Sequence, residues 1–194
     1  MFRQGLVSPL TTHKDPLERV GLSFNCPFAN KVISKSLIIL TGNKKYTLKY
    51  FVVDSHRVRF LRNSKCGSTS IVHALSEVYP VEAHPVWKSW DKSKKYLTFT
   101  VYRDQDERVY SAWKWMKRRC KYEEKTKEFE TFKKFAEENP YLDLHWMPQD
   151  YLLKKSDVVL NYNDLEEEFK KLCQRCGLTR VKFPLPRFKN SKNW

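Results

Sequence analysis

The chain has 194 residues and a formal net charge of +15, from 37 Lys and Arg against 22 Asp and Glu. Its hydrophobic residues make up 41% and its aromatic residues 14%, a composition that supports a packed core and excludes a disordered chain. We expect one domain over residues 1–194, in which residues 1–35 carry weak structural signals. The positive charge favours an anionic ligand, an acidic glycan, a nucleic acid or a membrane surface as partner.

Membrane insertion and disulfide bonding have little support in the sequence. The longest apolar run, Leu37–Leu40, is too short to span a bilayer. The first ten residues do not contain the apolar core of a signal peptide. Five scattered cysteines do not form a disulfide framework. These features predict a cytoplasmic protein without a transmembrane segment.

Strand and helix patterns alternate along the chain. Strands are expected at residues 36–40, 46–53, 57–62, 96–102 and 158–160, and helices at residues 69–79, 104–116, 129–136 and 164–177. This alternation predicts an α/β domain with a mainly parallel central sheet flanked by helices. In such sheets, ligands bind at the carboxyl ends of the strands.

The first chemical motif follows the strand expected at 57–62. A turn of small residues leads there into a helix, so consecutive backbone N–H groups can face one anion while the helix dipole and a lysine add positive charge. An ordinary capped helix start fits the same pattern. The residues of this predicted anion cradle are Lys65, Cys66, Gly67, Ser68, Thr69 and Ser70.

The second motif follows the strand expected at 96–102. Arg103 begins it and Ser111 lies eight residues later, on the predicted helix. Arg103 and Arg108 are candidates for anion binding. Mixed-charge runs more commonly form ion pairs on a solvated helix face, here with the neighbouring acidic residues.

An ATPase or GTPase loop does not fit these residues. Such a loop needs a glycine that four residues separate from a Gly-Lys-Ser/Thr sequence, whereas here Lys65 precedes the single glycine of the turn. The strand before Arg103 is not followed by the magnesium-binding aspartate pattern of those enzymes, because Asp104 comes after an arginine.

Taken together, the two motifs resemble those of the sulfotransferase superfamily. A third stretch, His145-Trp-Met-Pro-Gln149, is similar to an element of the Golgi carbohydrate sulfotransferases that act on chondroitin and related glycans. The similarity extends over about residues 57–191. The family's usual prolines are replaced by Ser64 before the loop lysine and by Gln105 after the Arg-Asp pair, and neither change removes an anion ligand.

The resemblance implies a P-loop-like three-layer fold and 3′-phosphoadenylyl sulfate (PAPS) as co-substrate, with no metal. In that family the loop around Lys65 holds the 5′-phosphosulfate, and the arginine and serine that match Arg103 and Ser111 hold the 3′-phosphate. Several members carry the catalytic base between these two motifs, where this chain has His84. His145 is the rival candidate for the base.

We therefore expect transfer of a sulfuryl group from PAPS to the hydroxyl group of an acceptor, a glycan or glycolipid. Two alternatives stay open from the sequence: first a basic nucleic-acid-binding module without catalysis, and second a nucleotide-dependent, kinase-like enzyme. Nucleic acid is not the partner that we expect. The sequence does not identify the acceptor or the oligomeric state.

Overall fold

The computed structural model describes residues 48–85 and 95–187. Residues 1–35 and the strand expected at 36–40 lie outside the described residues. The strands are β1 (Lys49–Val53), β2 (Val58–Leu61), β3 (Glu82–Pro85), β4 (Leu97–Tyr102) and β5 (Val158–Asn161). The helices are α2 (Ser68–Ser76), α3 (Gln105–Arg118), α4 (Glu123–Thr126), α5 (Phe129–Glu138), α6 (Asp150–Lys154) and α7 (Leu165–Arg175).

The sheet is mixed, with strand order β3-β1-β2-β4-β5. Strands β2, β4 and β5 are parallel, whereas β1 runs antiparallel to both β2 and β3. The expectation of a mainly parallel sheet is therefore wrong. The reason is local: a single 3₁₀ turn (Asp54–His56), closed by the left-handed residue Arg57, joins β1 to β2, and so short a connection permits only antiparallel pairing.

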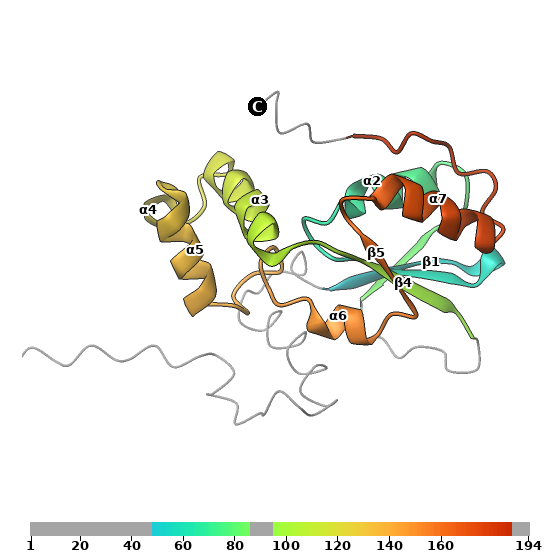
Figure 1. Ribbon diagram of the computed structural model, residues 1–194, viewed down its shortest axis with the longest axis horizontal. Coiled ribbons are helices and arrows are strands. Elements are labelled where there is room, and N and C mark those ends of the chain that lie inside the picture. Colours follow the sequence, from blue (N-terminus) through green and yellow to red (C-terminus); the bar gives the residue numbers. More distant parts are fainter. Residues whose placement is uncertain (1–47, 86–94, 188–194) are drawn as a thin grey trace, which may run out of the picture.

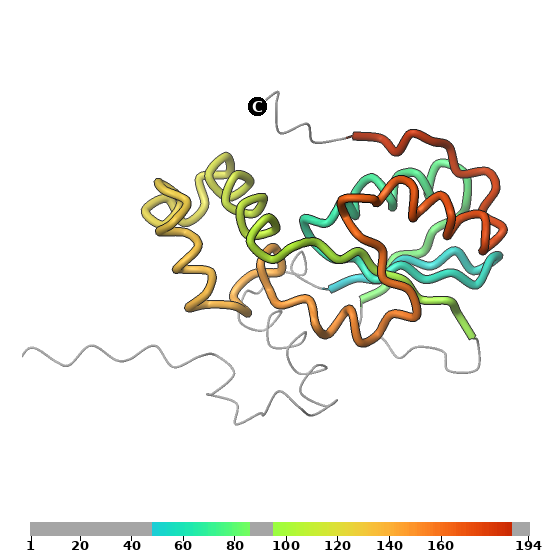
Figure 2. The backbone as a smooth tube through the Cα atoms, viewed as in Figure 1, coloured from blue at the N-terminus to red at the C-terminus, as the bar shows by residue number. Residues whose placement is uncertain are grey.

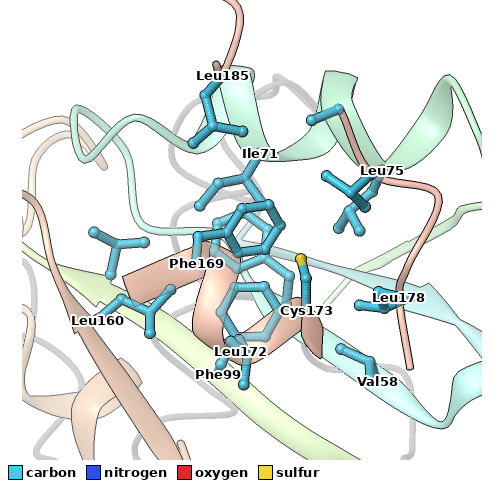
Figure 3. Close-up of a cluster of buried hydrophobic side chains, with 14 of the residues drawn as sticks. Val58, Ile71, Leu75, Phe99, Leu160, Phe169, Leu172, Cys173, Leu178 and Leu185 are labelled. Carbon is cyan, nitrogen blue, oxygen red and sulfur yellow. The ribbon is translucent and has the colours of Figure 1, made fainter. Parts of the chain in front are cut away.

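Helices cover both faces of this sheet. In Figure 1, α2 and α7 lie on one face and α6 lies on the other. The α2–α7 face holds the larger core, in which aromatic residues of β2, β4 and α7 pack together. Phe99 stacks on Phe60 with ring centroids 4.8 Å apart and lies 5.9 Å from Phe169. Figure 3 shows Phe169 in the middle of this cluster.

Helices α3, α4 and α5 form a separate group beside the sheet, as the tube in Figure 2 shows. Their core contains Val109, Met116 and Phe132 together with Trp146 from the loop before α6. Trp146 is 1% exposed and donates a hydrogen bond from Nε1 to the carbonyl of Asn139 over 2.9 Å. This contact anchors the 143–149 loop between the helical group and the sheet.

Across 48–85 and 95–187, none of the helices combines the length and the apolar character needed to cross a membrane.

The aromatic core gives a first prediction. Phe169 is fully buried, so Phe169→Ala should lower the free energy of unfolding by about 3–5 kcal/mol through lost burial and the cavity left behind. Phe169→Leu should cost clearly less. Urea unfolding followed by circular dichroism measures both variants. Equal losses for the two would contradict the packing described here.

Candidate functional site

A cavity of about 500 Å³ lies where β2, β4 and β5 end. This size is typical of small-molecule sites, which span about 300–1,000 Å³. Its walls come from the loop and helix after β2, from α3, from the loop before α6, from the start of α7 and from the C-terminal segment. The lining residues are Arg62, Ser64, Lys65, Gly67, Ser68, Thr69, Ser70, Arg103, Ser111, His145, Tyr162, Asn163, Leu165, Glu166, Leu185, Pro186 and Arg187.

The lining carries an excess of positive charge. Arg62, Lys65, Arg103 and Arg187 line the cavity, and Glu166 is the one acidic side chain among the lining residues. A concave site with this balance concentrates anions, because its low-dielectric walls strengthen the field of the cations. The cavity is therefore suited to a ligand with several negative charges.

The predicted anion cradle forms one wall of the cavity. Helix α2 begins at Ser68, after Gly67 in the left-handed conformation with φ of 71°. Ser68, Thr69 and Ser70 all line the cavity. The Ser70 N–H donates to the Gly67 carbonyl over 3.0 Å, but the earlier N–H groups of a helix have no partner within it. The helix dipole is positive there, so this end of α2 can bind phosphate or sulfate.

Backbone geometry in the cradle loop is strained at Lys65. This residue has φ of 67°, a conformation that costs a non-glycine residue about 1–3 kcal/mol. Two contacts stabilise the loop. Ser68 donates a hydrogen bond to the carbonyl of Asn63 over 2.8 Å, and Arg103 Nη1 donates to the carbonyl of Lys65 over 2.9 Å. The loop thus keeps the lysine in the cavity wall.

Arg103 and Ser111 reach the same cavity from β4 and α3. The Arg103 guanidinium lies 4.1 Å from the centre of the Tyr162 ring, and its Nε donates to Glu107 over 3.2 Å. Its side chain is 16% exposed. These contacts fix the orientation of the guanidinium. Because Arg103 also lines the cavity, part of the guanidinium can still bind an anion there.

Gln149 connects the ends of β2 and β4. Its Nε2 donates a hydrogen bond to the Arg103 carbonyl over 2.7 Å, and its Oε1 accepts from Asn63 Nδ2 over 2.7 Å and from the Arg103 backbone N–H over 3.2 Å. Asn63 Nδ2 also donates to the Val101 carbonyl over 2.9 Å. These bonds fix the distance between the cradle and Arg103.

Arg108 is buried and does not line the cavity. It acts as a clamp, because it binds backbone carbonyls of separate segments. It is 1% exposed and donates to the carbonyl of Ser64 over 2.9 Å, to that of Leu144 over 2.9 Å and to that of Met147. Burial lowers its pKa to about 10, with the Cys66 thiol acting in the opposite direction. The alternative that Arg108 pairs with neighbouring acidic residues on a solvated helix face is therefore wrong.

His145 lies in the cavity wall, and a buried carboxylate holds it there. Its Nδ1 contacts Asp143 Oδ1, and its backbone N–H donates to the same oxygen over 3.0 Å. Asp143 is 2% exposed. The imidazole ring stacks on Trp115, with centroids 4.4 Å apart and an interplanar angle of 20°. Because Nδ1 is engaged, Nε2 is the ring nitrogen available to a ligand.

The other histidine candidate, His84, lies apart from this cavity. It belongs to β3, where its Nε2 is 2.9 Å from Glu82 and its ring centroid 5.3 Å from that of Tyr50. Strand β1 lies between β3 and β2, so His84 is about 10 Å from the end of β2 by strand spacing. It is not among the lining residues.

Cys66 is inside the cradle loop but faces the core. It is fully buried, and burial raises its pKa to about 11 against the opposing effect of Arg108. Its thiol therefore stays protonated at neutral pH and is no reactive nucleophile. Among the residues that the structure describes, no group of three or more His, Cys, Asp or Glu side chains is placed to hold a metal ion.

Comparison of the chain with protein-family models, with curated proteins and with solved structures finds no match. Function has to be argued from the site.

Some contacts around the cavity were not expected from the sequence. Asp143 and Trp115 were not expected to contact His145. Trp115 had a usable signal, because it is four residues after Ser111 and so shares its helix face. Asp143 is two residues from His145, a spacing that gives no indication of a contact. The segment at residues 185–187 carried no chemical motif.

The cradle glycine gives a second prediction. Gly67 and Gly177 both have φ of 71°, but a Cβ on Gly67 would lie 2.6 Å from Leu165 Cδ2, whereas for one on Gly177 the nearest described neighbour is His56, at 3.8 Å. Gly177→Ala should cost about 1–2 kcal/mol of folding free energy from backbone strain alone. Gly67→Ala should cost more, because Leu165 has to move. Urea unfolding compares them, and equal losses would show that Leu165 yields freely.

Proposed function

We propose that the protein is a PAPS-dependent sulfotransferase in which residues 62–70 act as a P-loop-like anion loop. The observation that carries this proposal is the convergence of the lining residues: Lys65, the start of α2, Arg103, Ser111 and His145 all border one positively charged cavity. Each of the three sequence motifs supplies part of that set. The proposed acceptor is a hydroxyl group, on a glycan or glycolipid.

PAPS carries two anionic ends, and the cavity has two places for them. The 5′-phosphosulfate would bind at the start of α2 beside Lys65, and the 3′-phosphate at Arg103 and Ser111. Between Tyr162, Leu165 and Leu185 the lining is aromatic and apolar, which suits a nucleotide base. ATP has no 3′-phosphate, so a kinase-like function would leave Arg103 and Ser111 without a ligand.

The proposed reaction is an in-line displacement at sulfur. A bond forms between the acceptor oxygen and the sulfur, and the bond between sulfur and the bridging oxygen of the 5′-phosphate breaks. The electron pair of the broken bond leaves with adenosine 3′,5′-bisphosphate, and the acceptor proton passes to Nε2 of His145. Lys65 and the amides of α2 stabilise the charge that develops on the sulfonate and the phosphate.

The cavity favours His145 over His84 as the general base. A base has to come within hydrogen-bond reach of the acceptor hydroxyl, and His145 borders the cavity that would hold the donor. Asp143 would keep Nδ1 protonated and so present the basic lone pair on Nε2, as an orienting carboxylate does in other dyads. His84 was the first expectation from the sequence, and the arrangement moves the proposed role to its rival.

A third prediction concerns donor affinity. Arg103→Ala should weaken the binding of adenosine 3′,5′-bisphosphate by about 1.5–3 kcal/mol, the scale of a charge-assisted hydrogen bond. Ser111→Ala should cost less. Isothermal titration calorimetry measures both, with the exposed Arg175→Ala as a control of equal charge change. The proposal fails if the wild type does not bind the bisphosphate, or binds ATP as tightly.

A fourth prediction separates the two histidines. His145→Ala should lower turnover by about 10²–10⁴-fold, as loss of a general base does, with bisphosphate affinity nearly unchanged. His84→Ala should keep turnover close to that of the wild type. Transfer of radiolabelled sulfate from PAPS, once an acceptor screen has given a substrate, measures both. The reverse pattern would return the base to His84.

A further inference from the structure

Trp115 lies directly behind the proposed base. The imidazole of His145 stacks on the indole, with ring centroids 4.4 Å apart and an angle of 20° between the ring planes. His145 lines the cavity, whereas Trp115 does not. The indole is therefore placed to act on a ligand through the imidazole and not by direct contact.

The contact with Asp143 does not by itself fix the plane of the His145 ring. Asp143 Oδ1 contacts a single ring atom, Nδ1. The outer torsion of a histidine side chain has only broad preferences, so rotamer preference leaves the ring plane undefined. A ring held at one atom can turn about that contact, and Nε2 moves with it. A parallel aromatic ring against one face prevents this turn, because rotation of the imidazole would break the stack.

The fold holds the indole itself in place. Trp115 belongs to α3, where its neighbours Ala112 and Met116 are fully buried in the helical core. The helix therefore cannot rotate about its axis at this point. The start of α3 is bonded to the loop that carries the base, because Gln105 Nε2 donates to the Trp146 carbonyl over 2.8 Å. Both partners of the stack thus belong to one hydrogen-bonded unit.

A second reacting group contacts the same indole. Lys65 Nζ lies 5.9 Å from the centroid of the Trp115 ring, within the range of about 6 Å in which a cation is attracted to an aromatic face. Lys65 comes from the cradle loop and His145 from the loop before α6. In the proposed reaction the lysine acts on the sulfonate and the leaving phosphate, and the histidine acts on the acceptor. One side chain therefore touches the groups that serve both ends of the in-line displacement.

We propose that Trp115 is a positioning residue that fixes the imidazole plane of His145 relative to Lys65, so that Nε2 meets the acceptor hydroxyl. This inference rests on the proposed function and adds a residue to its machinery. Errors of about 1 Å in the placement of a reacting group can lower turnover about 10²-fold. Trp115 should therefore govern turnover and leave donor affinity nearly unchanged, because the cradle, Arg103 and Ser111 bind the donor.

Two substitutions of Trp115 test this role. Trp115→Leu removes the aromatic face and should lower turnover about 10–100-fold, with the affinity for adenosine 3′,5′-bisphosphate nearly unchanged. Trp115→Phe keeps an aromatic face and should recover most of the turnover. Transfer of radiolabelled sulfate from PAPS and isothermal titration calorimetry measure the two quantities. Equal turnover in Trp115→Leu and the wild type, or no recovery in Trp115→Phe, overturns the inference.

Trp113 provides a matched control on the same helix. It packs against Tyr110 and Phe129, with ring centroids 5.4 and 5.6 Å away, and it does not line the cavity. Trp113→Leu should weaken the helical group without disturbing the stack on His145, so its turnover should stay near that of the wild type. Thermal unfolding shows that all variants are folded at the assay temperature. An equal loss of turnover in Trp113→Leu and Trp115→Leu would indicate a general effect on stability and contradict the positioning role.

Nuclear magnetic resonance reads the stack without any acceptor. The chain has five histidines, so isotope labelling of histidine gives few ring signals, and His145→Ala identifies the one of interest. Ring protons above an indole face resonate upfield because of its ring current. The His145 signal should be upfield in the wild type and in Trp113→Leu, and should move downfield in Trp115→Leu. A wild-type signal without an upfield shift overturns the inference.

The outcomes separate this inference from the proposed function. A wild type that binds the bisphosphate and transfers sulfate, with Trp115→Leu equally active, keeps the sulfotransferase and loses the positioning role. A wild type that does not bind the bisphosphate loses the sulfotransferase and, with it, the role of Trp115 in turnover. In that case the resonance of His145 still decides whether the indole holds the imidazole.

Discussion

The buried guanidinium of Arg108 joins the parts of the molecule on which the candidate site depends. It donates hydrogen bonds to the carbonyl of Ser64 in the cradle loop and to those of Leu144 and Met147 on either side of His145. Without it, the helical group of α3–α5 and the loop after β2 would share few polar contacts. A charge this deeply buried is costly unless hydrogen bonds satisfy its donors, and here backbone carbonyls do so. The burial of Arg108 therefore costs folding free energy, but its hydrogen bonds fix the positions of the cavity walls relative to one another.

The parts of the site that the sequence indicated are those whose chemistry is local. A turn of small residues before a helix forms an anion site from neighbouring amides, and the spacing of Arg103 and Ser111 is set by the start of α3 directly after β4. Such patterns need no knowledge of distant contacts. The resemblance to the sulfotransferase superfamily rests on the same local patterns and on their order along the chain. All three motifs meet at one cavity, although their proposed ligand is still to be tested.

What the sequence could not indicate depends on contacts between distant segments. Arg108 stands in a run of charged residues and has the pattern of a solvated helix face, yet it is buried by the 143–149 loop. The strand β3 was not expected, because Glu-Ala-His-Pro has little preference for strands and forms one only by pairing with β1. His84 lies on that strand, which β1 separates from β2, and it does not line the cavity. The direction of β1 was missed because the short turn at Asp54–His56 outweighed the general alternation of strands and helices.

The clamp has a consequence for how this site can change during evolution. Arg108 binds carbonyl oxygens, and every residue type presents one. These bonds therefore put no demand on the side chains at positions 64, 144 and 147, of which Leu144 and Met147 are constrained only by their packing in the core, whereas no other residue type at position 108 has the same fork of donors. Gln149 likewise accepts and donates at the backbone of Arg103. Polar and charged identities in the loops can thus change while the bonds that shape the cavity are kept.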